Sequence, residues 1–323
     1  MFRNNFIFTF SNYENESDVG IYKRKRSREV IPCEEIKIAS PKSKLIVRNL
    51  LDWLKSYKKD DIYDFDSQEG YLHNISIRNN NNNEFMLEIY LHNNDGIDMF
   101  IKKIKEFDFA NLNIVSVYIQ IYKHHHNFRG EFTKIYGSDY LDYHFKKRTI
   151  SIYPGAFFQT NNDILFEMYN NILDIMNKES NIFMDLYCGV GVMSILSSDF
   201  YEKCYGIEIN SNSIDMANYN MKKNKLNNIE FICSPVEDII SNLVSNISEK
   251  ITIFINPPRS GLRKNVINEL NKIKKYVNQI VYLSCSEKTL GRDLKLFNYS
   301  SKIIKKYNMF LDTGHIETLC VLR

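Results

Sequence analysis

Short apolar runs alternate with amphipathic stretches along the second half of the chain. Five runs are rich in β-branched and aromatic residues: IFMDLYC at 182–188, KCYGIEI at 203–209, IEFICS at 229–234, ITIFIN at 251–256 and QIVYLSC at 279–285. Between them lie segments with apolar residues at helical spacing. This alternation predicts a parallel, doubly wound sheet with helices on both faces. The last two runs, IIKKYNMF at 303–310 and ETLCVLR at 317–323, predict a hairpin at one edge.

The first half of the chain has a different pattern, in which strand-like segments dominate. Polar and apolar residues alternate in FIFTF at 6–10, VGIYKRK at 19–25, LHNISIR at 72–78, FMLEIYL at 85–91 and IVSVYIQIY at 114–122. Helices are expected near 42–58, after Ser40-Pro41, and near 96–107. We therefore expect a smaller α+β domain at 1–150, whose sheet could leave one face to solvent, and an α/β domain at 151–323. The pattern changes near Arg148, in RTISIYPGAFFQTN, which ends in a turn.

Composition narrows the class of protein. A chain of 323 residues with 44% hydrophobic content is long enough for two folded domains, and a net charge of +3 does not require an acidic partner. The six cysteines include no CxxC pair, which argues against a structural zinc site and an iron–sulfur cluster and favours a reducing compartment. No apolar run approaches the roughly 20 residues that span a bilayer, and no secretory signal is recognisable. The cytoplasm is the expected location, with the nucleus or an organelle left open.

Three local features need an interpretation. The basic cluster Lys23, Arg24, Lys25 and Arg26 fits a solvated hairpin tip, a contact for RNA phosphates or a nuclear localisation signal. Three histidines at 124–126 do not predict a metal site, because neighbours in a strand point to opposite faces and no further ligand stands at suitable spacing. The asparagines at 79–83 fit a solvated hairpin loop.

Chemically active side chains follow the apolar runs of the second half. Asn256 and Cys285 each close a run, and the carboxyl ends of strands in an open α/β sheet form the ligand crevice. Gly189 and Gly191 allow a ligand to approach the backbone closely, and Glu208 follows about 20 residues later, where a carboxylate binds ribose hydroxyls. Ser194 replaces the third glycine of the dinucleotide fingerprint, which favours S-adenosylmethionine over NAD.

Five motifs occur in order: DLYCGVG, GIEI, INPPRSGL, LSCS and HIET. With them the chain resembles the RNA uracil-5 methyltransferases, which make 5-methyluridine in tRNA and bacterial ribosomal RNA. YPGAFFQTN at 153–161 and VGIYKRKRSREVIPCEE at 19–35 are similar to further family segments. The resemblance implies a Rossmann-like class I S-adenosylmethionine-dependent methyltransferase domain, preceded by a smaller α+β RNA-binding domain.

The resemblance also implies roles for single residues. Cys285 corresponds to the nucleophile and Glu317 to the base that removes the C5 proton. The cofactor pocket corresponds to Gln159, Tyr187, Gly189, Gly191, Glu208 and Asn256. No metal and no iron–sulfur cluster is expected, because the chain lacks the cysteines that hold such a cluster in some family members. In this compact organisation the chain is most similar to the tRNA-modifying members. RNA, with tRNA favoured, is then the expected partner, and no obligate protein partner is indicated.

The chemistry of uracil gives independent support to the pair of Cys285 and Glu317. Uracil C5 is a poor nucleophile until a thiolate adds at C6, and a base must afterwards remove the C5 proton. A thiol of ordinary pKa needs help to ionise, which the N-terminus of a helix expected at 286–297 would supply. Arg259 is expected to add positive charge, orient the base or contact the RNA.

The sequence departs from the family pattern at three positions. Asn256 stands where aspartate is usual, Ser286 where asparagine is usual, and Asn308 where an acidic residue is common. Because of these departures, a tRNA-binding or folding protein of this fold with weakened catalysis stays an alternative function. For the same methylation chemistry, ribosomal RNA is the alternative substrate. Amino-group methyltransferases also use an NPP segment, but they need an aromatic residue at the position of Arg259. Which uridine is modified stays open.

Overall fold

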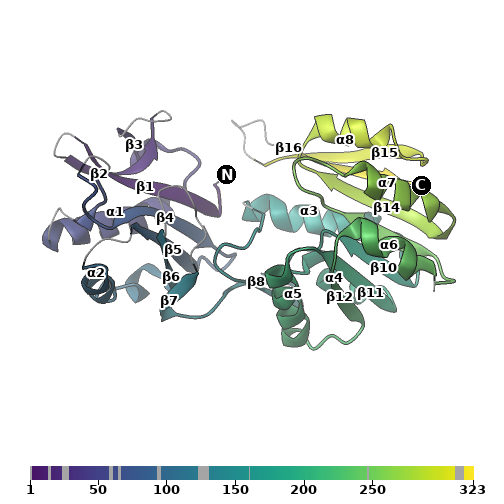
Figure 1. Ribbon diagram of the computed structural model, residues 1–323, viewed down its shortest axis with the longest axis horizontal. Coiled ribbons are helices and arrows are strands. Elements are labelled where there is room, and N and C mark those ends of the chain that lie inside the picture. The colour runs from purple at the N-terminus through teal and green to yellow at the C-terminus, as the bar shows by residue number, and fades with distance from the viewer. Residues whose placement is uncertain are drawn as a thin grey trace. The chain divides into compact units, whose positions relative to one another are not determined.

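The chain divides into two compact units. The computed structural model describes residues 2–13, 16–23, 29–57, 61–64, 67–92, 96–122, 131–159, 161–245, 247–309 and 316–323. The first unit comprises Met1–Tyr143 and Tyr153–Asn162, and the second comprises His144–Ile152 and Asp163–Arg323. Figure 1 shows the elements of both units along the chain.

The first unit is built on a seven-stranded sheet in the order β3-β2-β1-β4-β5-β6-β7. Its strands are β1 (Asn5–Tyr13), β2 (Glu16–Tyr22), β3 (Val30–Pro32), β4 (Leu72–Asn79), β5 (Phe85–His92), β6 (Ile114–Tyr122) and β7 (Phe132–Gly137). β5 and β6 pair in parallel, with helix α2 (Ile97–Ile104) in the connection between them. A separate two-stranded pair joins β8 (Leu141–Phe145) to β9 (Arg148–Ile152).

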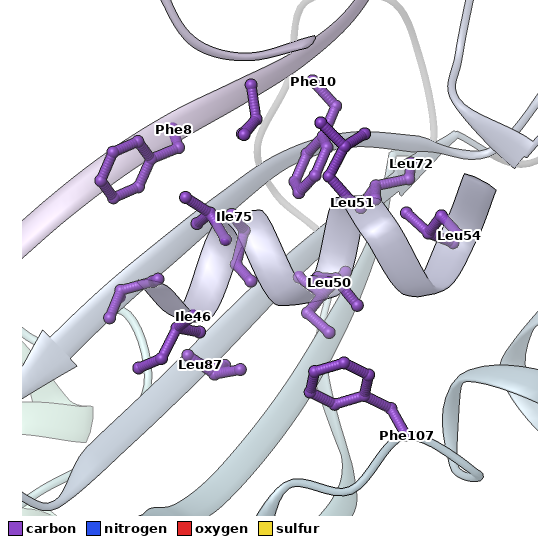
Figure 2. Packing of buried hydrophobic residues seen from close by; sticks show 14 of the residues in the cluster. Phe8, Phe10, Ile46, Leu50, Leu51, Leu54, Leu72, Ile75, Leu87 and Phe107 are labelled. Atoms are coloured by element: carbon purple, nitrogen blue, oxygen red, sulfur yellow. The ribbon is translucent and has the colours of Figure 1, made fainter. Parts of the chain in front are cut away.

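Helix α1 (Pro41–Tyr57) covers one face of this sheet. It begins as the sequence predicts, because Pro41 suits the first helical position and Ser40 Oγ accepts a hydrogen bond from the Ser43 backbone N–H at 3.0 Å. Its apolar residues recur at intervals of three and four: Ile46, Val47, Leu50, Leu51 and Leu54. Figure 2 shows this stripe packed against side chains of the strands.

The opposite face of the sheet carries polar residues that are nevertheless buried, so the expectation of a face left to solvent is wrong for its central strands. Arg78 on β4 and Glu88 on β5 lie on this face, and both are buried. Arg78 Nη2 donates to the carbonyl of Ala156 at 2.8 Å, and Glu88 Oε1 accepts from the Gly155 N–H at 2.9 Å. The backbone of the 153–162 segment thus satisfies part of their hydrogen-bonding capacity.

The asparagines at 79–83 form the expected hairpin loop, since Asn79 pairs with Phe85 at the end of the β4–β5 ladder. Asn80 is not solvated, however. Its side chain is buried, and its Oδ1 accepts from the backbone N–H groups of Asn82 and Glu84. The Asn80 side chain therefore builds the turn, as asparagine commonly does.

The second unit contains a mixed seven-stranded sheet in the order β12-β11-β10-β13-β14-β16-β15. Its strands are β10 (Ile182–Leu186), β11 (Lys203–Glu208), β12 (Ile229–Cys233), β13 (Ile251–Ile255), β14 (Val277–Ser284), β15 (Ser301–Asn308) and β16 (Ile316–Leu322). β10 to β14 run parallel, whereas β16 is antiparallel to β14 and β15. The predicted parallel sheet with an edge hairpin is confirmed.

Helices cover both faces of this sheet, as the alternating pattern predicts. The helices are α3 (Asn162–Ile175), α4 (Val192–Ser197), α5 (Ser211–Lys223), α6 (Val236–Ser245), α7 (Lys264–Lys272) and α8 (Glu287–Leu294). Apolar residues of α6, α7 and α8 share one core with the strands, and α3 and α4 contact the other face through side-chain hydrogen bonds. No helix in the described part of the chain has the length and apolar character to cross a membrane.

Candidate active site

Four adjacent parallel strands of the second unit end at the same edge of the sheet. Tyr187 follows β10, Glu208 ends β11, Asn256 follows β13 and Cys285 follows β14. The chain leaves β10 toward β11 on one side, while β13 pairs with β10 on the other. Such a switch point leaves a crevice at the carboxyl ends of the strands, where ligands of open α/β sheets bind.

The turn after β10 has an unusual backbone. Tyr187, Gly189 and Gly191 have positive φ angles of 64°, 53° and 83°. The N–H groups of Tyr187 and Cys188 both donate to the carbonyl of Ile207, at 2.9 and 3.1 Å, which fixes the turn against β11. A side chain is rarely accommodated at such angles, so the two glycines relieve strain that Tyr187 retains.

Gly189 and Gly191 differ in their surroundings. A Cβ atom at Gly189 would meet nothing within 4 Å, whereas one at Gly191 would lie 2.6 Å from Cζ of Phe231 and 3.1 Å from Cβ of Ala217. Gly189 therefore faces open space that a ligand can enter, and Gly191 is required by close packing against β12 and α5.

Glu208 is held in a fixed orientation by the backbone. Its Oε1 accepts from the N–H groups of Ile209 and Asn210, both at 2.9 Å, and its Oε2 accepts from the Gly189 N–H at 3.3 Å. The carboxylate is partly exposed and still has capacity to accept from hydroxyl groups. Ile209, next to it, is 64% exposed, a position that the sequence analysis did not single out.

A buried carboxylate beneath the turn also escaped the sequence analysis. Asp185 Oδ2 accepts from both the backbone N–H and the Oγ–H of Ser194, at 2.9 and 2.8 Å. Burial raises the pKa of Asp185 to about 7, against the effect of these hydrogen bonds. Ser194, which replaces the third glycine of the fingerprint, thus anchors α4 to the end of β10. The available signal was an acidic residue inside an otherwise apolar strand.

Cys285 lies between the end of β14 and the start of α8. Ser286 is the N-cap of this helix, and its side chain accepts from the Thr289 N–H. The helix begins as expected but ends at Leu294, three residues before the predicted end. Serine is a favourable N-cap, so its presence in place of the family's asparagine preserves the local structure.

The environment of Cys285 does not activate the thiol on balance, contrary to the expectation from the helix N-terminus. The pKa of Cys285 is raised, first by partial burial and second by the negative charge of Glu317. The guanidinium of Arg259 lowers it, as does a backbone hydrogen bond. The two favourable contributions are smaller than the effect of burial and the carboxylate, so the sulfur is held mainly as a thiol.

Glu317 comes next to Cys285 through strand pairing. Ser284 of β14 pairs with Thr318 of β16 at the end of their antiparallel ladder, so Cys285 and Glu317 are the next residues in register. Glu317 is only 7% exposed, and its charge acts on the thiol. A half-buried thiol and a buried carboxylate therefore stand together beside the NPPR segment.

Gln159 belongs to the first unit, whereas the other cofactor candidates lie in the second. The side-chain Nδ2 of Asn4 donates to the Gln159 carbonyl at 2.9 Å and also contacts Asn162. Gln159 and its neighbour Phe158 are buried, but Phe157 is 78% exposed. An exposed phenylalanine in a fixed segment is a further residue that the sequence analysis missed.

The basic and histidine-rich segments fall largely outside the described residues. Lys23 is described: its backbone N–H donates to the Glu29 carbonyl at 3.0 Å, and its Nζ pairs with the Glu29 carboxylate. Arg24, Lys25 and Arg26, like the histidines at 124–126, lie outside the described part of the chain. Among the residues that are described, no cluster of three histidine, cysteine or acidic side chains could hold a metal ion.

Comparison with known proteins gives a match over nearly the whole chain. A family model described as tRNA (uracil-5-)-methyltransferase matches residues 8–323. An uncharacterized RNA methyltransferase of Fusobacterium nucleatum is 32% identical over 326 residues, which cover 98% of this chain and 68% of that protein. A second, from Clostridium acetobutylicum, is 29% identical over 336 residues, with coverages of 100% and 72%.

Solved structures show the same fold. The tRNA (uracil-54, C5)-methyltransferase of Pyrococcus abyssi, in complex with S-adenosyl-L-homocysteine, aligns with a TM-score of 0.81 and 21% identity over 99% of this chain and 76% of that one. A putative methyltransferase from Streptococcus mutans aligns with a TM-score of 0.52 and 10% identity, over 98% and 87%. At these identities the similarity concerns the fold.

Proposed function

The chain belongs to the tRNA (uracil-5-)-methyltransferase family, whose members depend on S-adenosylmethionine, and on this premise we propose that it methylates C5 of a uridine in RNA through Cys285 and Glu317. The observation that carries the proposal is the register of β14 and β16, which makes a partly exposed thiol and a buried carboxylate neighbours. Addition of a nucleophile at C6 and removal of a proton at C5 require one group of each kind, close together.

The residues at the strand ends fit S-adenosylmethionine. The open space at Gly189 admits a ligand against the backbone, and the fixed carboxylate of Glu208 can accept from both ribose hydroxyls. We assign Tyr187, Gly191 and Asn256 to the same pocket, and Gln159 stays a cofactor-binding candidate on the family resemblance alone. Asn256 keeps one acceptor oxygen in place of the usual carboxylate and adds a donor. When bound, the cofactor supplies the methyl group that C5 takes up.

The reaction requires three events from the protein. Cys285 loses its proton to solvent water, which can reach the partly exposed thiol, and the thiolate forms a bond to C6, which moves the electron pair of the C5–C6 double bond toward C5. After C5 carries the new methyl group, Glu317 removes the remaining C5 proton. The electron pair of that C–H bond restores the C5–C6 double bond, and the Cys285 sulfur leaves C6 as a thiolate.

The raised pKa of Cys285 fits a site that forms its nucleophile only when substrate is present. In the free enzyme the charge of Glu317 disfavours the thiolate, which protects the sulfur from adventitious reaction. A cationic cofactor beside the pair would oppose this effect of Glu317. Arg259, which already favours the thiolate, is available to help in the same way.

We further propose tRNA as the substrate, with the T-loop uridine as the preferred target. The family description refers to tRNA, and the Pyrococcus abyssi protein of the same fold is named for uracil-54 of tRNA. The first unit then serves as an RNA-binding domain, with Lys23, Arg24, Lys25 and Arg26 as candidate phosphate contacts. Ribosomal RNA is the alternative substrate for the same chemistry.

The proposal is tested with tRNA in which uridine is replaced by 5-fluorouridine. Fluorine cannot leave C5 as a proton does, so after methyl transfer the enzyme is expected to remain attached to the RNA through Cys285. With S-adenosylmethionine present, a denaturant-stable protein–RNA adduct should form. Replacement of the exposed thiol in Cys233→Ser should preserve the adduct, whereas Cys285→Ser should abolish it.

The other outcomes decide between the alternatives. A protein that binds the tRNA with strong salt dependence but forms no adduct would be a binding or folding module, and the catalytic assignment would be wrong. Mapping the attached nucleotide in mixtures of tRNA and ribosomal RNA fragments identifies the substrate. An adduct found only on ribosomal RNA would overturn the choice of tRNA and leave the chemistry intact.

A further inference from the structure

Asp293 of α8 is a fully buried carboxylate that the proposed chemistry does not use. It is 0% exposed, and its Oδ2 accepts from the Tyr282 hydroxyl of β14 and from the Leu262 backbone N–H, both at 2.8 Å. Leu262 belongs to the connection between β13 and α7, which begins at Asn256. One carboxylate thus joins the nucleophile's strand, the helix after it and the 256–262 loop.

Arg292 completes this junction. Its Nε and Nη2 donate to Asp293 Oδ1 at 2.8 and 2.6 Å, so the buried negative charge is matched by a two-pronged partner. Nη2 also donates to the carbonyls of Ser260 and Leu262, both at 3.0 Å. The Arg292 side chain therefore binds the backbone of the loop. These contacts would be retained whatever side chains occupy positions 260 and 262.

The loop approaches α8 too closely for a side chain at Gly261. A Cβ atom there would lie 2.7 Å from Asp293 Oδ2, 2.8 Å from Arg292 Nη2 and 2.9 Å from Cβ of Thr289, and the φ angle is +72°. Both the space and the backbone conformation require glycine. The loop is therefore fixed against the helix by packing as well as by hydrogen bonds.

The two elements joined in this way carry the groups of the reaction. The loop contains Asn256 and Arg259, and Ser286, the N-cap of α8, immediately follows Cys285. The Arg259 side chain is exposed, and its charge acts on the Cys285 sulfur. An exposed side chain on an eight-residue connection stays near one atom only if the backbone that carries it is held.

We propose that Asp293, together with Arg292, is a positioning residue that fixes the 256–262 loop against α8 and so keeps the Arg259 guanidinium beside the reacting sulfur of Cys285. The inference rests on the proposed function of Cys285 as a nucleophile. It extends that function by assigning a role to a residue that contacts neither uridine nor cofactor. Asp293 acts through Arg259, and its removal should change the thiol only when Arg259 is present.

The test measures the pH dependence of Cys285 alkylation by iodoacetamide, read from the mass of the Cys285 peptide. This readout requires neither RNA nor cofactor, so it is independent of whether the 5-fluorouridine adduct forms. In Asp293→Asn the midpoint should move to higher pH, with alkylation at pH 7.5 slowed about threefold to tenfold, as expected when a nearby cation is displaced. Arg259→Gln should give a similar shift.

The double variant Arg259→Gln/Asp293→Asn distinguishes positioning from general destabilisation. If Asp293 acts through Arg259, the double variant has the midpoint of Arg259→Gln alone. Additive shifts, or a folded Asp293→Asn protein with an unchanged midpoint, would overturn the proposal. Glu269→Gln is the matched control, because this carboxylate on α7 bonds Ser241 and Lys272 away from the junction and should leave the midpoint in place.

A second variant decides the matter if Asp293→Asn does not fold. Arg292→Lys keeps a cation beside the buried carboxylate but cannot maintain all the loop contacts of the guanidinium. The side chain is half-exposed, so folding should tolerate the change. The same upward shift, absent in the Arg259→Gln background, supports the proposal, and an unchanged midpoint contradicts it.

Discussion

Glu317 raises the pKa of Cys285 from the neighbouring position across the β14–β16 ladder. The residue that we assign as the base thus works against formation of the nucleophile as long as its carboxylate is charged and the site is empty. The direction of this effect leads directly to a measurement on the free protein.

Removing the charge of Glu317 should make the Cys285 thiol more acidic. In Glu317→Gln the second-largest cause of the raised pKa is absent, so the midpoint of Cys285 alkylation should move to lower pH. Below the midpoint the thiolate fraction then rises by roughly threefold or more. Glu287→Gln is a suitable control, since this carboxylate is close in sequence but pairs with Lys306 and is not among the charges that shift Cys285. Equal midpoints in Glu317→Gln and the unaltered protein would show that the two groups are not coupled.

The same substitution should stop the reaction at its last stage. On ordinary uridine-containing tRNA, Glu317→Gln can still form the bond from Cys285 to C6, but no base removes the C5 proton. A denaturant-stable adduct should therefore accumulate without fluorine, and turnover should fall by at least about a hundredfold, the usual range for loss of a general base. Gel electrophoresis under denaturing conditions measures the adduct. Normal turnover would exclude Glu317 as the base.

The two glycines of the β10 turn should respond differently to alanine. At Gly189 the φ angle of 53° costs about 1 kcal/mol with alanine, but no atom lies within 4 Å of the new Cβ. We expect Gly189→Ala to bind S-adenosylmethionine weakly while its thermal unfolding changes little. Gly191→Ala should unfold at clearly lower temperature, because the new Cβ meets the Phe231 ring and Ala217. Calorimetry of binding and of unfolding separates these effects, and the reverse pattern would place the ligand elsewhere.

The buried carboxyl of Asp185 should make stability depend on pH. Its pKa is about 7 in the folded protein, above the value of about 3.9 expected on unfolding, so folding favours the protonated form. The favourable contribution of Asp185 to the free energy of unfolding is complete below about pH 4. It is lost as the pH rises through 7, at up to about 1.4 kcal/mol per pH unit. Asp185→Asn keeps an acceptor for Ser194 and does not titrate. The difference in unfolding free energy between the two proteins, measured in urea at several pH values, should therefore change by a few kcal/mol, whereas a constant difference would argue against a raised pKa.

Sequence patterns predicted those parts of the fold that depend on local periodicity. Each apolar run of the second half became a strand. The central strands β10, β13 and β14 are buried along most of their length, as expected of strands covered on both faces, whereas β15 at the edge of the sheet is largely exposed. The prediction for the helix after Cys285 ran three residues too far. Leu296 and Phe297 continue the apolar spacing, although the helix itself ends at Leu294. Periodicity reports which residues are buried, and it does not mark where the helical hydrogen bonds stop.

Contacts between distant residues could not be predicted in this way. The bonds of Asp293 to Leu262 and of Arg78 to Ala156 join positions that only the tertiary fold brings together. The pKa of Cys285 is a further example, since it depends on the balance of burial, Glu317 and Arg259. The sequence identified the groups involved and predicted that the helix N-terminus would lower the pKa of Cys285. The larger effect on this pKa is that of burial, which raises it.

The core beneath α1 should be sensitive to loss of single side chains. Leu50 is fully buried between α1 and the sheet (Figure 2), so Leu50→Ala removes apolar contacts and leaves a cavity, at a cost of about 2 to 5 kcal/mol. Leu45, on the same helix, is 53% exposed, and Leu45→Ala should change stability by less than about 0.5 kcal/mol. Urea unfolding measures both. Because Leu50 lies in the first unit and the Cys285 thiol in the second, Leu50→Ala should leave the pH midpoint of Cys285 alkylation unchanged at temperatures where the protein is folded. A shifted midpoint would mean that damage to this core reaches the thiol, and that the pH dependence of alkylation cannot be attributed to Glu317 and Arg259 alone.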